Sequence, residues 1–221
     1  RGGSKGIKKK NIVDFLGQPL IEYTIEQALN SETVDEVYVS TDAEDIAEVS
    51  RNAGAKIIER PDEIAGDEAT TESALLHALK VLREEKDVEP EIMTLLQCTS
   101  PLRREEDIDL TVKLVTEEGY DSALSVCEDH SFYWEKSDNG AEPINYNPQT
   151  RKRRQDIEKR YQENGSIYVF KKEILEDKEC RLGGKIGIHK MPETHSFEID
   201  IPEDLEITQA IGRQVDFYSG G

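Results

Sequence analysis

The chain has 221 residues, of which 34% are charged and 36% are hydrophobic, and its formal net charge at pH 7 is -19. This length is enough for one α/β domain with a full core, and no apolar run approaches the roughly 20 residues that cross a membrane. The negative charge disfavours non-specific binding to nucleic acid or to anionic membranes. We therefore expect a cytoplasmic protein with no nucleic-acid partner and no membrane partner.

The first predicted element is a glycine-rich loop over residues 1–11 that also carries several cations. Glycines let a backbone turn tightly and present its N–H groups to an anion, and Arg1, Lys5 and Lys10 can neutralise phosphate oxygens. The loop matches neither of the two commonest nucleotide signatures, so a flexible basic segment is the alternative interpretation. An apolar strand normally leads into a loop of this kind, and we expect residues before Arg1.

Helices and strands alternate after the loop. Helical spacing of apolar residues predicts helices from Pro19 and over residues 45–53, 72–85, 104–117, 172–176 and 202–211. Apolar runs predict strands over residues 34–41, 55–58, 92–96, 122–126, 166–170 and 186–190. This alternation favours a Rossmann-like α/β fold, with a mostly parallel sheet flanked by helices and a ligand at the carboxyl ends of the strands.

The alternation breaks over residues 129–163, which are rich in Asn, Pro, Arg and aromatic residues. Structureless loops of that length are uncommon inside compact domains. We therefore predict one α/β domain over residues 1–128 and 164–221, with an inserted protrusion over residues 129–163 that forms a dimer contact.

Two acidic residues, Glu198 and Asp200, alternate with the apolar residues Phe197, Ile199 and Ile201. In an extended, half-buried strand this spacing places both carboxylates on one face, where they can share a hard cation. Acidic pairs on a surface usually bind nothing, which is the alternative. The three cysteines are widely spaced and fit neither a disulfide framework nor a zinc site.

Several motifs, taken in order, resemble those of the acylneuraminate cytidylyltransferases, which are the CMP-sialic acid synthetases and their relatives. The resemblance extends from Arg1 to about Ile211 and is specific because the motifs occur in the family's order. The motifs are residues 1–6, 10–11, 40–42, 60–61, 96–103, 164–168 and 198–200.

The resemblance implies a reaction in which the anomeric hydroxyl of an acidic keto-sugar attacks the α-phosphorus of CTP, with Mg²⁺ or another divalent cation present. The protein partner that we expect is a second copy of this chain, which forms a homodimer through the protrusion, and the resemblance gives residues of this chain roles in four groups. The catalytic group is Arg1, Lys5, Lys10 and Asp200; the nucleotide-binding group is Gly2, Gly3, Ser4, Gly6, Asn11, Arg60 and Thr71; the sugar-binding group is Gln97, Arg154, Gln162 and Tyr168; the metal ligands are Glu198 and Asp200.

Three of these residues also have structural interpretations. Arg60 can form a surface ion pair, Gln97 can be a buried structural amide, and an aromatic residue such as Tyr168 is more often part of a core than a ligand contact.

The chain departs from the family pattern in three places. Glu198 stands where the family usually has aspartate, and its longer side chain keeps the negative charge. Gln162 and Glu163 stand where many members have an arginine, so that Arg154 takes over the grip on the sugar carboxylate. Arg181 and Leu182 stand where enzymes for N-acetylneuraminate often have a phenylalanine pair. The resemblance thus points to a different nonulosonic acid, such as a legionaminic or pseudaminic relative.

The leading hypothesis is a nucleotidyltransferase that moves CMP from CTP to an acidic nonulosonic sugar and releases pyrophosphate. The alternatives are a non-catalytic sugar-nucleotide-binding module and a cytidylyltransferase for ketodeoxyoctulosonic acid. A glycosyltransferase fits less well, because a lysine-rich loop suits a free triphosphate.

Overall fold

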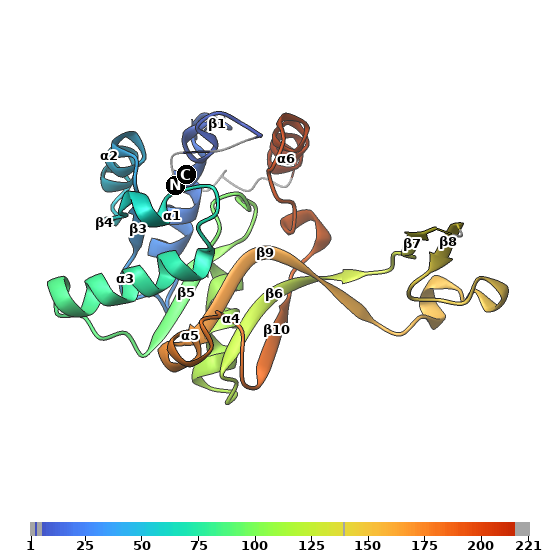
Figure 1. Ribbon diagram of the computed structural model, residues 1–221. Helices are drawn as coiled ribbons and strands as arrows, with labels where there is room; N and C mark the ends of the chain where they lie inside the picture. Colours follow the sequence, from blue (N-terminus) through green and yellow to red (C-terminus); the bar gives the residue numbers. More distant parts are fainter. Residues whose placement is uncertain (1–2, 4–5, 139, 215–221) are drawn as a thin grey trace.

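The computed structural model describes residues 3, 6–138 and 140–214, without the side chain of Arg154, and it has a central β-sheet with helices on both faces (Figure 1). This arrangement confirms the predicted α/β class. The helices are α1 (Leu20–Asn30), α2 (Glu44–Asn52), α3 (Thr71–Lys86), α4 (Glu105–Thr116), α5 (Lys172–Lys178) and α6 (Pro202–Gln214). The strands are β1 (Asp14–Phe15), β2 (Gln18–Pro19), β3 (Tyr38–Thr41), β4 (Lys56–Glu59), β5 (Ile92–Leu96), β6 (Ser122–Asp129), β7 (Trp134–Ser137), β8 (Gly140–Pro143), β9 (Arg160–Lys171) and β10 (Ile186–Lys190).

The largest sheet has four strands in the order β10-β6-β9-β5, and β3 and β4 form a parallel pair of their own. Strands β6 and β10 are parallel, whereas β9 runs antiparallel to both of its neighbours, β5 and β6. The sheet is therefore mixed, where we expected a mostly parallel one. The reason lies in the chain path, because β9 returns beside β6 directly after the protrusion, without the helical crossover that a parallel pair requires.

Apolar residues cover both faces of the four-stranded sheet. On one face, Ala123, Ile167 and Val169 pack against Ile108 and Val112 of α4. On the other face, the alternate sheet residues Leu124, Tyr168 and Phe170 form a second cluster with Leu79 of α3 and Leu175 of α5. Burying such a side chain stabilises the fold by about 1.5–3 kcal/mol. Burial on both faces explains why these strands have nearly continuous apolar sequences.

Most predicted elements begin and end within a few residues of the observed ones, and β9 and β3 are the main exceptions. Strand β9 begins at Arg160 instead of the predicted residue 166, because it continues into the protrusion beside β6. Strand β3 begins at Tyr38 instead of the predicted Val34, because its partner β4 begins only at Lys56. Helix α3 begins where Thr70 accepts a hydrogen bond from the backbone N–H of Ser73 and ends at Asp87, which has a left-handed backbone.

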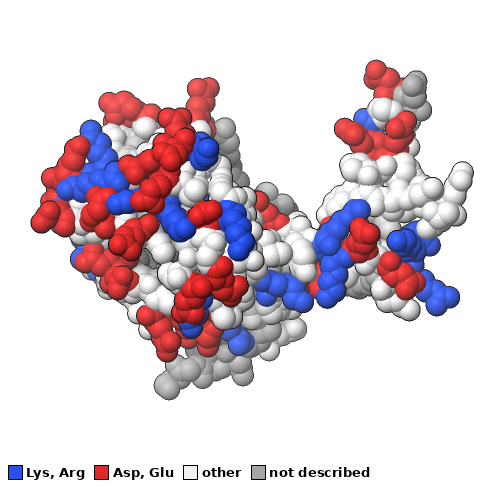
Figure 2. All heavy atoms as spheres, turned by 90° about the horizontal axis from the view of Figure 1, so that it is seen from below, with Lys and Arg blue, Asp and Glu red and all other residues white. Residues whose placement is uncertain are grey.

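Residues 129–163 project from the body of the molecule (Figures 1 and 2). Strands β6 and β9 continue past the edge of the sheet as a two-stranded ribbon, with Asp129 opposite Arg160, and carry the hairpin of β7 and β8 at its end. A register shift between Leu124 and Val126 marks the place where the ribbon leaves the sheet. Figure 2 shows Asp and Glu side chains over much of the visible face of the body, with Lys and Arg side chains among them.

In the part of the chain that the structure describes, no helix is long and apolar enough to span a bilayer.

Candidate functional site

The site begins where the end of the glycine-rich loop meets the acidic pair. The Lys10 ammonium donates hydrogen bonds to the carbonyl oxygen of Ile199 at 2.9 Å and to the Asp200 carboxylate at 2.8 Å. The Lys10 side chain is 14% exposed and the Asp200 side chain is 66% exposed, so the lysine is held in place while the carboxylate faces solvent. Two predicted catalytic residues, 190 positions apart, thus lie in direct contact.

Two glycines let the acidic segment come this close. A Cβ atom on Gly6 would lie 2.1 Å from the carbonyl oxygen of Asp200, a distance that no side chain tolerates. Gly165 has a φ of +67°, which favours glycine, and a Cβ there would lie 3.1 Å from a carboxylate oxygen of Glu198. The backbones at Gly6 and Gly165 therefore form the walls against which Asp200 and Glu198 rest.

Glu198 is half-buried and bound to the segment that follows β5. The Thr99 hydroxyl donates to its carboxylate at 3.0 Å, and the Thr99 carbonyl accepts a hydrogen bond from the Ile199 N–H at 2.8 Å. Burial raises the pKa of Glu198 above its usual value, and the negative charge of Asp200 adds to the rise, whereas the Thr99 hydroxyl opposes it. Thr99 lies in a motif quoted above, but sequence reasoning gave it no role.

The predicted half-buried strand over residues 197–201 is wrong. Residues 196–200 are irregular, and of the three apolar residues Ile199 is fully buried whereas Phe197 and Ile201 are 37% and 48% exposed. The physical reason is the start of α6, where the Asp204 carboxylate accepts hydrogen bonds from the backbone N–H groups of Asp200 and Ile201. These bonds satisfy two amides without a neighbouring strand and bend the chain into the helix.

A cavity of about 1260 Å³ lies beside the acidic pair and extends between β3 and β5. Four predicted binding residues and Thr99 line it, and Thr99 connects it to Glu198. These four are Asn11, Arg60, Thr71 and Gln97.

Two of these four residues lie at the carboxyl ends of strands, and a third begins a helix. The side-chain oxygen of Asn11 accepts a hydrogen bond from the Cys98 thiol at 3.0 Å, directly after β5. The Arg60 guanidinium donates to the carbonyl oxygen of Ser40 at 2.8 Å and to its hydroxyl at 3.2 Å, so the loop after β4 is tied to the end of β3. Thr71 is the first residue of α3.

The backbone of Gln97 is anchored by a fully buried arginine. The Arg103 guanidinium donates to the carbonyl oxygen of Gln97 at 2.8 and 2.7 Å, to Ser166 and to the Thr24 hydroxyl. Arg103 is 0% exposed. Sequence reasoning placed Arg103 in a motif but did not recognise this role, because two of its partners, Thr24 and Ser166, come from distant parts of the chain.

The other predicted sugar-binding residues lie elsewhere. Tyr168 is 2% exposed, the Arg181 guanidinium lies 4.3 Å above its ring, and its hydroxyl donates to Glu163. Burial raises the pKa of Tyr168 to about 12, and the bond to Glu163 adds to this effect. Gln162 is exposed on β9, and Arg154 begins a 3₁₀ turn, Arg154–Asp156, in the protrusion. Among the described residues that line the cavity, Tyr168 and Gln162 do not occur.

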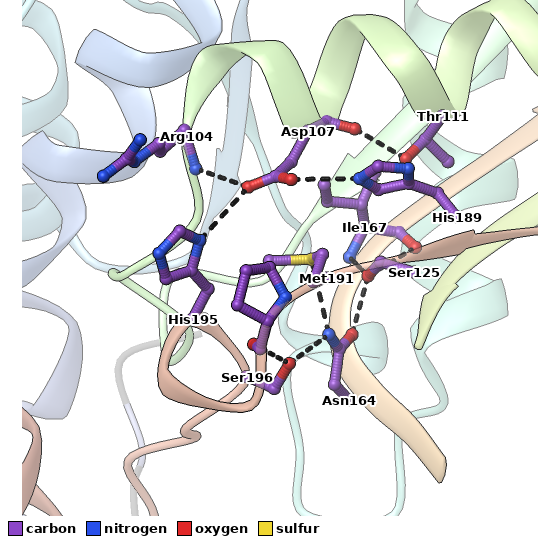
Figure 3. Close-up of polar contacts among 11 residues, drawn as sticks. Arg104, Asp107, Thr111, Ser125, Asn164, Ile167, His189, Met191, His195 and Ser196 are labelled. Carbon is purple, nitrogen blue, oxygen red and sulfur yellow. Dashed lines mark hydrogen bonds and ion pairs between the residues drawn. The ribbon is translucent and has the colours of Figure 1, made fainter. Parts of the chain in front are cut away.

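The segment that leads to the acidic pair is held by the two polar groups in Figure 3. In the first, the carboxylate of Asp107 in α4 accepts a hydrogen bond from the Arg104 N–H and lies 2.9 Å from the His189 ring and 3.8 Å from the His195 ring. Burial alone would raise the pKa of Asp107, but these partners hold it below its usual value. The contact fixes His195, three residues before Glu198. The sequence signal that could have indicated this role is the place of Asp107, an acid at the third position of helix α4.

In the second group, the side-chain amide of Asn164 joins three elements. Its oxygen accepts a hydrogen bond from the Ser125 hydroxyl at 2.6 Å, at the register shift of β6, and its nitrogen donates to Ser196 at 3.0 Å and to the Met191 sulfur at 3.3 Å. Asn164 therefore connects the base of the protrusion to the acid-bearing segment.

The acidic pair fits a magnesium ion that is held in part by substrate. Within residues 3, 6–138 and 140–214, no group of three or more His, Cys, Asp or Glu side chains could hold a metal by itself. Magnesium usually binds through one or two carboxylates together with phosphate oxygens. An exposed Asp200 carboxylate next to a second carboxylate supplies that donor set.

Four predicted residues of the loop, Arg1, Gly2, Ser4 and Lys5, lie outside the described residues. Gly3 is exposed, and a Cβ atom there would meet nothing within 4 Å.

The sequence model of the cytidylyltransferase family matches residues 1–221. The chain is 38% identical over 213 residues to N-acylneuraminate cytidylyltransferase A of Danio rerio, a match that covers 95% of this chain and 48% of that protein. It is 29% identical over 223 residues to the pseudaminic acid cytidylyltransferase of Campylobacter jejuni, covering 96% of this chain and 92% of that protein. The chain spans about half the length of the curated fish relatives it matches.

The fold is also that of solved cytidylyltransferases. A structure of CMP:2-keto-3-deoxy-manno-octonic acid synthetase complexed with CTP aligns with a TM-score of 0.70 at 19% identity, covering 97% of this chain and 96% of that chain. These findings confirm the resemblance to acylneuraminate cytidylyltransferases, and the chain belongs to the cytidylyltransferase family.

Proposed function

We propose that this protein transfers CMP from CTP to the anomeric hydroxyl of an acidic nonulosonic sugar and releases pyrophosphate. The relatives named for N-acylneuraminate and pseudaminic acid support the class of sugar. The observation that carries the proposal is the contact of Lys10 with Asp200, in a segment whose Glu198 is bound by Thr99 to a cavity lined by Asn11, Arg60 and Gln97.

In this proposal the loop and the cavity share the recognition of CTP. Arg1, Lys5 and Lys10 bind the triphosphate together with the amides of the loop, and their positive charge stabilises the leaving pyrophosphate. Asn11 orients the α-phosphate and the ribose, while Arg60 and Thr71 contact the base. Lys10 lies beside Asp200, so one ammonium can contact both the phosphates and the acidic pair.

Asp200 and Glu198 are the residues that would hold a divalent cation. Such an ion would supply positive charge to the phosphate oxygens of CTP and align the reacting groups. Asp200 is the more exposed of the two carboxylates and would take the stronger grip on the ion. The proton of the attacking sugar hydroxyl would pass to one of these acids, to a water molecule or to the sugar's own carboxylate.

For the sugar site we propose the residues that were predicted from the sequence. Gln97 lines the cavity next to Thr99 and is the nearest candidate for contacts with the sugar hydroxyls. Tyr168, Gln162 and Arg154 reach this site only if the substrate extends along β9 or if a second subunit contributes. The homodimer contact through residues 129–163 and the cytoplasmic location also stay predictions.

The test is a pyrophosphate-release assay with CTP, magnesium and a panel of eight- and nine-carbon keto acids. We expect release only when nucleotide, acid and metal are present together. The panel contains N-acetylneuraminate, legionaminic, pseudaminic and ketodeoxyoctulosonic acids, so it also separates the alternative substrate. Failure with every acid, combined with calorimetric binding of CTP or CMP, would instead support the non-catalytic binding module.

A further inference from the structure

The side-chain amide of Asn164 is buried and uses all of its hydrogen-bonding groups. Its oxygen accepts two hydrogen bonds, one from the Ser125 hydroxyl at 2.6 Å and one from the Ser166 N–H at 3.3 Å. Its nitrogen donates two, one to Ser196 at 3.0 Å and one to the Met191 sulfur at 3.3 Å (Figure 3). A primary amide offers two acceptor positions and two donor hydrogens, so each of them has a partner here.

The direction of this amide follows from its partners. The Ser166 N–H can only donate, so the atom that faces it is the amide oxygen, and the nitrogen points to Ser196. The Ser196 hydroxyl donates its own hydrogen to the carbonyl oxygen of Pro192 at 3.0 Å, so it serves as the acceptor for the Asn164 nitrogen. The hydroxyl of Ser196 is therefore held from both sides.

A bulge in β9 presents two neighbouring residues to the acid-bearing segment. The register shift of β6 leaves residues 164–167 of β9 opposite the single residue Ser125. Bulges of this kind re-aim side chains and often lie beside active sites. In this bulge Asn164 bonds to the segment, and Gly165 lies where a Cβ atom would be 3.1 Å from the Glu198 carboxylate.

The acid-bearing segment depends on anchors of this kind. Residues 196–200 belong to neither a helix nor a strand. On one side of Glu198, the amide described above holds Ser196. On the other side, the Ile199 N–H donates to the carbonyl oxygen of Thr99 at 2.8 Å. The carboxylate of Glu198 is carried between these two anchors, so its position depends on both.

We propose that Asn164 is a positioning residue for the reaction, because its amide sets the place of Glu198 and thereby the place of the divalent cation. This inference rests on the proposed function, in which Glu198 and Asp200 hold that ion. Asn164 is not among the described residues that line the cavity, so it acts through Ser196 and not by touching a substrate. A misplacement of about 1 Å in an active site can cost on the order of a hundredfold in rate.

Three substitutions test this role. Asn164→Ala removes the whole amide, and Ser196→Ala removes the acceptor that joins it to the acid-bearing segment. Ser122→Ala is the matched control. The Ser122 hydroxyl is buried as well, donates to the carbonyl oxygen of Gly183 at 2.8 Å and accepts from its N–H at 3.0 Å, but it lies at the start of β6 and not at the bulge. Each variant loses hydrogen bonds of a buried side chain, so each should lose some stability.

The first measurement is hydrogen exchange at the Ile199 amide, which reports on the anchor without any need for activity. The rates are compared with those of the slowest amides of the sheet, so that a change in global stability cancels. We expect exchange at Ile199 to quicken by more than about tenfold in Asn164→Ala and Ser196→Ala, and much less in Ser122→Ala. Equal exchange in all three variants would overturn the proposal.

The second measurement is the magnesium dependence of pyrophosphate release. In Asn164→Ala and Ser196→Ala we expect the half-saturating magnesium concentration to rise about fivefold or more and kcat to fall about 10- to 100-fold, while KM for CTP changes less than about threefold. Ser122→Ala should keep the parent's kinetic constants. Should Asn164→Ala fail to fold, Ser196→Ala carries the test, because it leaves the amide's other three hydrogen bonds in place.

The outcomes separate this inference from the function on which it rests. A parent chain that releases no pyrophosphate would refute the proposed function. An active parent whose Ser196→Ala variant keeps the parent's kcat and magnesium dependence would refute only the role of Asn164.

Discussion

Replacing Gly6 with alanine tests how the loop is held against the acidic pair. The added Cβ would lie 2.1 Å from the Asp200 carbonyl oxygen, and the two atoms must separate by about 1.3 Å to reach an ordinary contact of 3.4 Å. The clashing atom is backbone, so no side-chain rotation relieves it. Overpacking of this kind costs about 1–3 kcal/mol. For a chain of this length that corresponds to a fall of roughly 2–12 °C in the unfolding midpoint.

The same shift moves Asp200 away from Lys10, and a misplacement of about 1 Å in an active site can cost on the order of a hundredfold in rate. The assays are urea unfolding and pyrophosphate release. Gly66→Ala is the matched control for stability, because a Cβ at Gly66 meets nothing within 4 Å. Its unfolding free energy should change by less than about 0.5 kcal/mol. Equal stability of Gly6→Ala and Gly66→Ala would contradict the close approach of Gly6 to Asp200.

Three further substitutions address the charges of the site. Lys10→Met should lower kcat by about 100- to 1000-fold in the pyrophosphate assay, as loss of one preorganised charge contact does, while Lys8→Met, at an exposed neighbour, should leave it nearly unchanged. Because burial raises the pKa of Glu198, its contribution to the unfolding free energy falls as pH rises above the unfolded pKa of about 4.3. Glu198→Gln should remove that fall when urea titrations at about pH 4 and 7 are compared. A variant that is less stable than the parent at about pH 7 would contradict the raised pKa. The pKa of Asp107 is lowered instead, since its hydrogen bonds outweigh burial, so its stabilisation is present above about pH 3.9 and is lost as pH falls through the lower folded pKa. Asp107→Asn should therefore cost about 1–3 kcal/mol near neutral pH and less in acid, and a pH-independent loss of stability would refute the ionic role.

Local patterns were enough to predict most helices and strands. Helix α3 was predicted over residues 72–85 and spans Thr71–Lys86, because its apolar spacing and its cap residues lie within the same short segment. The direction of β9 could not be predicted in this way, because it depends on the path of the chain through the protrusion. The prediction of a strand around Ile199 was wrong for a related reason. The alternation was present, but Asp204 caps the following helix and takes the amides that a strand would use.

The site was predicted from the resemblance more than from physical patterns. The contact between Lys10 and Asp200 joins residues 190 positions apart, and nothing local in either segment indicates the other. The supporting residues Arg103, Asp107 and Asn164 were not assigned roles for the same reason. Their partners come from separate helices and strands, so their function becomes visible only when the chain is folded.

The amide of Asn164 gives the protrusion a mechanical relation to the reaction centre. It joins Ser125, at the pivot where the ribbon departs from the sheet, to Ser196, two residues ahead of Glu198. A change in the tilt of the ribbon would therefore change the geometry of hydrogen bonds that end two residues before Glu198. Binding at the hairpin of β7 and β8 would in this way bear on the position of that carboxylate.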